Sequence, residues 1–206
     1  VSFEDPDGII NQTRYTQPCM VAFAAGMTAL LAERGIVPAA AAGLSLGEYS
    51  ALHAAGVFDA DTAVELVAFR GKAMEDAAAG RPSAMVAVLG LDRAALQEAC
   101  DEASARGCVV IANYNCPGQL VISGSVEAVD AACAKLKEAG AKRALRLPVG
   151  GAFHSPLMEP AKVELEKAIN EAPFQAPVCP IYQNVDAKPQ TDPATIKANL
   201  IAQLTA

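Results

Sequence analysis

The chain has 206 residues, of which 52% are hydrophobic and 19% are charged. This composition supports a buried core and excludes a disordered chain. The formal net charge of −7 argues against a nucleic-acid-binding domain, which is normally basic. The length fits one large domain or one domain that carries a smaller insert.

The sequence gives no indication of a membrane or metal protein. Its N-terminal residues are acidic without a signal-peptide pattern, and Glu33, Arg34 and Pro38 interrupt the longest apolar stretch. We therefore expect a cytoplasmic protein without a membrane span. The six cysteines form no Cys-x-x-Cys pair and have only two histidines to accompany them, so no zinc site is expected.

Helical patterns dominate the first eighty residues. The spacing of apolar residues predicts a helix from Thr16 to Arg34, with Pro18 in its first turn and Gly35 ending it. A buried strand is predicted from Ile36 to Ala42, although alanine favours strands only weakly. Two more helices are predicted, over Glu48–Ala55 and Asp61–Ala79.

The pattern changes after Arg81-Pro82, where strands and helices alternate in the order βαββαβ of a ferredoxin-like unit. This order predicts an inserted domain over residues 83–148, which leaves 1–82 and 149–206 as one discontinuous domain. The strands expected in the insert are Met85–Leu89, Val109–Ala112, Gln119–Ser123 and Lys142–Val149, and its helices are Asp92–Ala105 and Val126–Ala139. Beyond it we expect a helix over Met158–Asn170, a strand over Val178–Asn184 and a helix over Pro193–Leu204.

The segment Gly43-Leu44-Ser45-Leu46-Gly47 has the pattern of a nucleophile elbow. In such a turn, we expect that only glycine fits on either side of the serine. The turn lifts the serine hydroxyl clear of the sheet, and the helix that follows offers its free N–H groups to an oxyanion. Ser45 is therefore predicted to be a nucleophile.

A nucleophilic serine needs a base, and the only histidines are His53 and His154. His53 lies about two helical turns after Ser45, so we interpret it as a packed or surface side chain. His154 lies in a glycine-bounded loop beyond the insert, in the order nucleophile then histidine. No acidic residue between Ser45 and His154 occupies a suitable loop, so a backbone or amide oxygen would have to orient His154.

Arg70 is the third candidate, within the predicted Asp61–Ala79 helix. A lone helical arginine is usually a surface charge, whereas a guanidinium that faces the site would bind a carboxylate through two hydrogen bonds. Gly71 beside it would permit the close approach of another group.

Together these segments resemble the malonyl-CoA:acyl carrier protein transacylases, a family of acyltransferases. The resemblance covers essentially the whole chain. It rests on Thr16-Gln17-Pro18, Gly43–Ala51, Arg70–Met74, Asn113–Gln119, Val121–Gly124, Ala152–Met158 and Asn184-Val185-Asp186.

The resemblance implies an α/β fold, with a hydrolase-like large domain built on a parallel sheet and an inserted ferredoxin-like small domain. The site would lie in the cleft between them, and Phe153 would disfavour substrates with a methyl branch. The implied roles are Ser45 as nucleophile, His154 as base, the Leu46 backbone N–H as oxyanion donor, Arg70 as partner of the malonyl carboxylate, and the Gln203 backbone carbonyl as the group that orients His154. The implied cleft-lining residues are Met74, Asn113, Asn115 and Phe153.

The implied reaction transfers a malonyl group from malonyl-CoA to the phosphopantetheine thiol of acyl carrier protein, through a malonyl-serine intermediate, for fatty acid biosynthesis. We expect no cofactor beyond the coenzyme A thioester, no metal, no nucleic-acid or membrane partner, and a monomer. The chain departs from the family at Leu44, where many members have histidine. It also begins beyond the family's Gly-Gln-Gly loop and stops shortly after Gln203, so we expect a partly or fully inactive fragment.

Three other functions remain open at this stage. An acyltransferase domain of a polyketide synthase would share the same residues. A serine esterase is disfavoured by Arg70 and by the missing acidic residue. A non-catalytic fragment could bind only the carrier protein.

Overall fold

The computed structural model describes residues 3–205, and the chain divides into two compact units. The first unit contains the chain up to Ala73 together with Ala161–Gln203. The second contains Met74–Pro160 and the chain from Leu204. The predicted insert, residues 83–148, lies inside the second unit.

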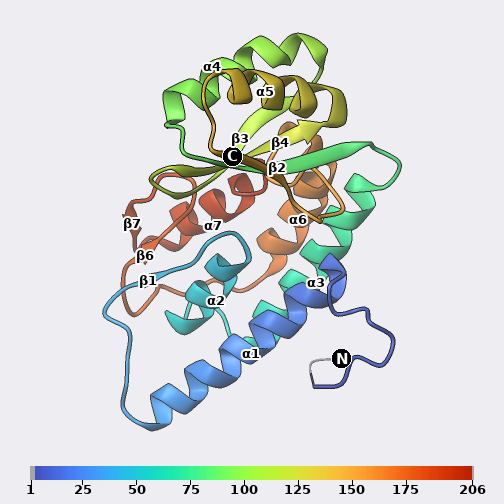
Figure 1. The fold of residues 1–206 in the computed structure, drawn as a ribbon. Helices are drawn as coiled ribbons and strands as arrows, with labels where there is room; N and C mark the ends of the chain where they lie inside the picture. The colour runs from blue at the N-terminus through green and yellow to red at the C-terminus, as the bar shows by residue number, and fades with distance from the viewer. Residues whose placement is uncertain (1–2, 206) are drawn as a thin grey trace. The chain divides into compact units, whose positions relative to one another are not determined.

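Helices make up most of the first unit (Figure 1). Its buried apolar residues include Val21, Leu52, Leu165 and Ile196. The helices are α1 (Thr13–Glu33), α2 (Leu46–Ala54), α3 (Ala60–Ala78, which continues into the second unit), α6 (Glu159–Glu171, which begins in the second unit) and α7 (Pro193–Ala202).

Helix α1 begins earlier than the sequence predicts. It starts at Thr13 rather than Thr16, so Pro18 lies inside the helix and not in its first turn. The extra residues are helical because the Gln12 carbonyl accepts hydrogen bonds from the backbone N–H groups of Tyr15 and Thr16. An Asp5 carboxylate that accepts the N–H groups of two following residues orders the preceding turn.

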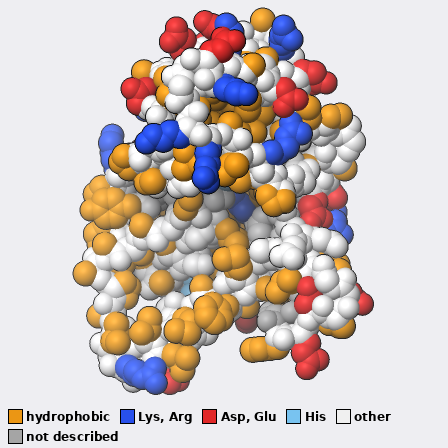
Figure 2. Space-filling model, in the orientation of Figure 1, with side chains coloured by type: hydrophobic (Ala, Val, Ile, Leu, Met, Phe, Trp, Pro, Cys, Tyr) orange, Lys and Arg blue, Asp and Glu red, His pale blue; other side chains and the backbone are white. Residues whose placement is uncertain are grey.

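Much of the apolar surface of α1 is exposed in the described chain. By length and composition α1 could cross a membrane, and 17% of its most apolar window is buried. The prediction that no apolar run reaches this length is therefore wrong. Core helices and signal sequences have the same properties, so the helix alone does not decide the protein's location. Figure 2 shows hydrophobic side chains over the region where Figure 1 draws α1 and the loop after it. The exposed large apolar residues of this region are Met20, Phe23, Met27, Leu30, Leu31, Ile36 and Val37.

The sheet of the first unit is small and mixed. Strands β1 (Ala41–Ala42), β6 (Ile181–Tyr182) and β7 (Pro189–Gln190) lie in the order β1-β6-β7, with β1 parallel to β6 and β6 antiparallel to β7. The predicted strands Ile36–Ala42 and Val178–Asn184 are therefore wrong in length, because only two residues of each pair. Prolines at 38 and 180 lack the N–H group that a longer ladder requires. Because β1 and β6 are parallel and in register, the segments that follow them meet at one edge.

The second unit contains the predicted βαββαβ order, which confirms the ferredoxin-like unit. All its strand pairs are antiparallel, in the order β3-β4-β2-β5. The elements are β2 (Ser83–Leu89), α4 (Arg93–Ala103), the 3₁₀ helix η1 (Ser104–Arg106), β3 (Val109–Cys116), β4 (Gln119–Ser125), α5 (Val126–Glu138) and β5 (Arg143–Arg146), and η2 (Pro156–Met158) follows. Acidic and basic side chains intersperse over α4 and α5 (Figure 2).

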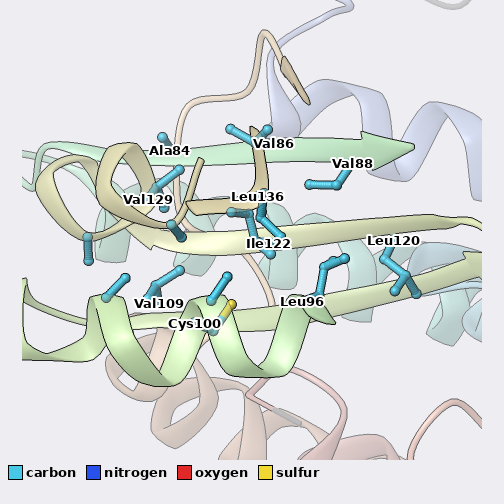
Figure 3. Packing of buried hydrophobic residues seen from close by; sticks show 14 residues of the cluster. Ala84, Val86, Val88, Leu96, Cys100, Val109, Leu120, Ile122, Val129 and Leu136 are labelled. Carbon is cyan, nitrogen blue, oxygen red and sulfur yellow. The ribbon is translucent and has the colours of Figure 1, made fainter. Parts of the chain in front are cut away.

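The core of this unit lies between the sheet and helices α4 and α5 (Figure 3). Side chains from alternate positions of the strands, such as Val86 and Ile122, meet Leu96 of α4 and Leu136 of α5. Alternate strand positions share one face, and because both faces are covered these strands are short, largely apolar runs in the sequence. A smaller cluster, formed by Met85, Ala87, Ala112 and Val121, takes the intervening positions, and Phe153 packs against it.

Candidate active site

Ser45 lies at the turn between β1 and α2, as the elbow pattern predicts. Its φ of 51° and ψ of −106° place a non-glycine residue in a region of the backbone map that L-residues rarely adopt. A Cβ atom on Gly43 would lie 2.1 Å from the Gly47 backbone, so position 43 requires glycine. A Cβ atom on Gly47 would meet no atom within 4 Å, so the expectation that glycine is needed on both sides is wrong.

The start of α2 offers a backbone donor beside Ser45. Leu46 is the first residue of the helix, so its N–H group has no acceptor within the helix. The next two N–H groups, of Gly47 and Glu48, donate to the carbonyl oxygens of Leu44 and Ser45. The Leu46 N–H is therefore suited to the oxyanion role that the resemblance implies, and that role remains a prediction.

Arg70 of α3 is the largest fully buried side chain of the described residues, and its guanidinium contacts Ser45. Its Nη2 atom donates to Ser45 Oγ at 2.9 Å and to Gln203 Oε1 at 3.2 Å. Its Nη1 atom donates to Gln17 Oε1 at 2.8 Å. The guanidinium carbon also lies 5.5 Å from the centre of the Tyr49 ring, a cation–π contact.

The position of Arg70 depends on Gly71. A Cβ atom at Gly71 would lie 2.9 Å from the Arg14 Cα atom and from the Thr13 carbonyl oxygen. Helix α3 therefore approaches the first turn of α1 too closely for any side chain at this point, which confirms the predicted close approach. This contact places Gln17, one turn further along α1, at the guanidinium.

The buried Glu48 carboxylate interacts with the Arg70 charge electrostatically, and no hydrogen bond joins the two side chains among the described residues. Among residues 3–205 Arg70 forms no ion pair, and its three hydrogen-bond acceptors are neutral oxygens. Its buried Nε atom has no hydrogen-bond partner in that range. Burial lowers the pKa of the Arg70 guanidinium and raises the pKa of Tyr49 to about 12, because desolvation penalises both charged forms. A buried cation with spare donors is suited to bind an anion.

Gln203 contacts the elbow through its side chain, a role that sequence reasoning missed. Its Nε2 atom donates to the Ser45 carbonyl oxygen at 3.0 Å, while its Oε1 atom accepts from Arg70. The side chain therefore links the nucleophile's backbone to the cation. The predicted role of its backbone carbonyl in orienting His154 stays a prediction.

Asn184 and Glu48 are the other site residues that sequence reasoning did not assign. Asn184 follows β6 and reaches the elbow, where its Oδ1 atom accepts from the Ser45 N–H at 2.6 Å. Its Nδ2 atom donates to the Gly43 carbonyl at 2.7 Å. Glu48, fully buried in the first turn of α2, accepts from the Asn184 backbone N–H and from Gln183 Nε2. These contacts depend on the pairing of β1 with β6, which brings the two loops together and which no local pattern in the sequence signals.

His53 is packed, as the sequence suggested. Its Nδ1 atom lies 3.2 Å from the Phe58 carbonyl oxygen within the first unit. Among residues 3–205, no group of three or more His, Cys, Asp or Glu side chains could hold a metal ion.

His154 belongs to the second unit, where it is 8% exposed and has a φ of 54°. The turn around it is fixed by two hydrogen bonds, from Ser123 Oγ to the Phe153 carbonyl and from Ser155 Oγ to the Ala152 carbonyl. The other predicted cleft residues also lie in this unit, with Met74 buried and Asn113 and Asn115 on β3. The structure thus brings Ser45, Leu46, Arg70 and Gln203 together in one unit, and His154, Phe153, Met74, Asn113 and Asn115 belong to the other.

A model of the family described as "Acyl transferase domain" matches residues 3–203. The chain belongs to this acyl transferase family. It is 43% identical over 202 residues to the malonyl CoA-acyl carrier protein transacylase of Escherichia coli K12, covering 98% of this chain and 65% of that protein. This acyl transferase chain therefore spans about two thirds of the length of the curated relative.

Solved structures give the same result for the fold. The acyl carrier protein S-malonyltransferase of Vibrio cholerae is 44% identical with a TM-score of 0.95, over 98% of this chain and 67% of that one. A malonyl-transacylase solved in complex with a type II polyketide synthase acyl-carrier protein is 40% identical with a TM-score of 0.92, over 97% and 65%. These matches confirm the predicted α/β acyltransferase fold and the family resemblance on which the predicted site residues depend.

Proposed function

We propose that this chain transfers a malonyl group from malonyl-CoA to the phosphopantetheine thiol of an acyl carrier protein, in fatty acid biosynthesis. The observation that carries this proposal is the buried Arg70 guanidinium, which has only neutral acceptors and donates to the nucleophile. A malonyl carboxylate gains charge-assisted hydrogen bonds from this cation, whereas an acetyl group leaves it without an anionic partner.

The first half-reaction acylates Ser45. Ser45 Oγ attacks the thioester carbonyl of malonyl-CoA while His154 accepts the hydroxyl proton, and the Leu46 N–H stabilises the oxyanion. The carbon–sulfur bond then breaks, and coenzyme A leaves with the proton that His154 returns. Arg70 holds the malonyl carboxylate throughout, and the Gln203 backbone carbonyl keeps His154 oriented.

The second half-reaction repeats these steps in reverse. The carrier thiol attacks the malonyl-Ser45 ester and gives its proton to His154, which returns it to Ser45 Oγ as the ester bond breaks. Phe153 disfavours a methyl-branched acyl group, and Met74, Asn113 and Asn115 line the cleft. We further propose that the enzyme needs no cofactor beyond the coenzyme A thioester and acts as a cytoplasmic monomer.

The comparisons support both the reaction and the partner. The Escherichia coli relative is named for malonyl transfer between coenzyme A and acyl carrier protein. The Vibrio cholerae protein is named an acyl carrier protein S-malonyltransferase.

A second candidate is the same transfer to the carrier protein of a polyketide synthase. It is favoured by the similarity to the transacylase solved with a type II polyketide synthase carrier. Malonyl transfer to purified fatty acid and polyketide carrier proteins, compared side by side, decides between the two pathways.

The reaction is tested by intact-mass analysis of the chain after brief incubation with malonyl-CoA. We expect a malonyl adduct on the wild type, none on Ser45→Ala, and much less adduct from acetyl-CoA. Absence of the adduct from a chain that is folded by circular dichroism would overturn the proposal. In that case, retained carrier binding would identify a non-catalytic binding role, and rapid turnover of neutral esters would identify an esterase.

A further inference from the structure

The conformation of Ser45 needs support, because its positive φ is unfavourable for a residue with a Cβ atom. Turns of this kind persist only where surrounding groups hold the backbone. Two backbone groups just before the nucleophile, the Gly43 carbonyl and the Ser45 N–H, lie on either side of Leu44. Both are held by the same side chain, Asn184.

Asn184 suits this bridge because a primary amide carries an acceptor and a donor on one planar group. Its Oδ1 atom accepts from Ser45 N at 2.6 Å, and its Nδ2 atom donates to Gly43 O at 2.7 Å. Gln203 Nε2 lies 3.5 Å from the same Oδ1 atom and donates to the Ser45 carbonyl. Three of the backbone polar groups that flank the turn therefore have side-chain partners.

The position of Asn184 is in turn fixed by Glu48. One carboxylate oxygen of Glu48 accepts from the Asn184 backbone N–H at 2.8 Å, and the other accepts from Gln183 Nε2 at 3.0 Å. The orientation of the Gln183 amide is fixed, because its Nε2 atom also donates to the Ile196 carbonyl and its Oε1 atom accepts from Asn199. A flip of the amide would break both hydrogen bonds. These two partners of Glu48 are both donors, the Gln203 side chain also hydrogen-bonds to it, and a carboxylate is the side chain that can accept from several donors at once.

We infer that Asn184 is a positioning residue that clamps the nucleophile elbow, with Glu48 as the anchor that holds Asn184 in place. Among the described residues, Asn184 has no hydrogen bond to Arg70; it acts through the backbone that carries the Ser45 side chain. The inference rests on the proposed role of Ser45 as nucleophile, and no role was assigned to the segment Asn184-Val185-Asp186 by the sequence.

The test compares Asn184→Ala with Asp186→Ala in the intact chain. Asp186 serves as the matched control, because it lies in the same turn and, within the described chain, has no hydrogen bond to the elbow. Its carboxylate accepts hydrogen bonds from the Lys188 backbone N–H and from the Gln190 side chain. We expect Asn184→Ala to lower the first-order rate of Ser45 malonylation about 10- to 100-fold, as the loss of two hydrogen bonds would. The malonyl-CoA concentration for half-maximal rate should stay unchanged, since the Arg70 contacts remain.

Two further measurements test the positioning role of Asn184 independently of malonyl transfer. The rate of labelling by a fluorophosphonate, a general serine-directed reagent, should fall similarly in Asn184→Ala and not in Asp186→Ala. Hydrogen exchange of the Ser45 amide, followed by NMR, should accelerate at least about tenfold, because its acceptor is removed. Glu48→Gln should accelerate the same exchange by less, since a glutamine can still accept from one of the two donors.

The outcomes distinguish the positioning role of Asn184 from the proposed malonyl transfer. Unchanged acylation, labelling and Ser45 exchange in folded Asn184→Ala would overturn the clamp while leaving the proposed function intact. Asn184-dependent fluorophosphonate labelling in a chain that forms no malonyl adduct would support the clamp and overturn the proposed acyl donor. Equal losses in Asn184→Ala and Asp186→Ala would reduce Asn184 to a general structural residue of the turn and overturn the inference.

Discussion

The Nη2 atom of Arg70 lies 2.9 Å from Ser45 Oγ and donates a hydrogen bond to it. The side chain expected to recognise a carboxylate therefore also contacts the expected nucleophile. While the oxygen accepts this bond, one of its lone pairs is engaged. A carboxylate is a stronger acceptor than a hydroxyl and competes for the guanidinium, so the arrangement links recognition of the acyl group to the state of the serine.

Replacing Arg70 by alanine should remove the preference for malonyl-CoA over acetyl-CoA. The loss of charge-assisted hydrogen bonds to the carboxylate should lower kcat/KM for malonyl-CoA about 100- to 1,000-fold, and that for acetyl-CoA far less. Arg70→Lys keeps the positive charge but loses the planar guanidinium that can donate two parallel hydrogen bonds. Its ratio of kcat/KM for malonyl-CoA to kcat/KM for acetyl-CoA should therefore lie between those of the wild type and Arg70→Ala. Steady-state kinetics with both thioesters measure this ratio.

The control for this experiment is Arg34→Ala, because Arg34 is an exposed arginine of the same unit. It should leave both thioester rates unchanged. Thermal unfolding of each variant is needed as well, since Arg70→Ala leaves the Gln17 and Gln203 side chains without their shared donor. An unchanged malonyl-to-acetyl ratio in a folded Arg70→Ala protein would exclude Arg70 from substrate recognition.

Sequence patterns located the second unit well because its central strands β2 and β4 are long runs of mostly apolar residues that are buried on both faces. Successive side chains of β2 and β4 enter two buried clusters on opposite faces, and the βαββαβ order follows from the four strands and the two helices of the unit. The sheet of the first unit has strands of two residues, which are too short to show any periodicity. Strand β7, Pro189–Gln190, was missed altogether for the same reason.

In the candidate site, too, residues in a local sequence pattern could be assigned, and residues brought together from distant positions could not. Ser45 and Leu46 could be assigned because the elbow is a pattern of five adjacent residues. Asn184 contacts Ser45 from 139 positions away, and Gln203 contacts it from 158 positions away. Contacts at such separations depend on the register of β1 with β6 and on the packing of α7, neither of which a single sequence displays.

Alanine should have opposite effects at the two glycines of the elbow. In Gly43→Ala the new methyl group would overlap the Gly47 backbone, so we expect a loss of about 1–3 kcal/mol in unfolding free energy and no acylation. Gly47 lies in the first turn of α2 with open space at its Cβ position, so Gly47→Ala should stabilise the chain by about 0.5–1 kcal/mol and keep the acylation rate. Urea unfolding and intact-mass acylation test the pair; similar behaviour of the two variants would contradict the elbow geometry.

Glycine at position 45 should be more stable than alanine at the same position. Both substitutions remove the hydroxyl and its bond to Arg70, but only glycine relieves the strain of a φ of 51°. Relief of about 1–3 kcal/mol, offset in part by the entropy of glycine in the unfolded chain, leaves an advantage of about 1 kcal/mol. That difference corresponds to a melting temperature about 2–4 °C higher for Ser45→Gly in calorimetry. Equal melting temperatures would show that the turn is not strained.

Glu48 should make the stability of the chain depend on pH in an unusual direction. Burial is the largest influence on its carboxyl group and raises its pKa above 4.5, while hydrogen bonds from Asn184 and Gln183 oppose the rise. The folded state then binds the Glu48 proton more tightly than the unfolded state does. The stabilisation of the folded chain by protonated Glu48 is therefore fully present below about pH 4.5 and is lost as the pH rises through the raised pKa.

Glu48→Gln removes this titration, so the stability of the wild type relative to the variant should fall as the pH rises above 4.5 and then level off. The steepest decline should approach about 1.4 kcal/mol per pH unit. Urea unfolding of both proteins across this range gives the difference, and Glu127→Gln supplies a control with the same change in charge at an exposed position of α5. A difference that rises with pH instead would mean that the hydrogen bonds to Glu48 outweigh its burial, so that the ionised carboxylate is the form that the folded chain favours.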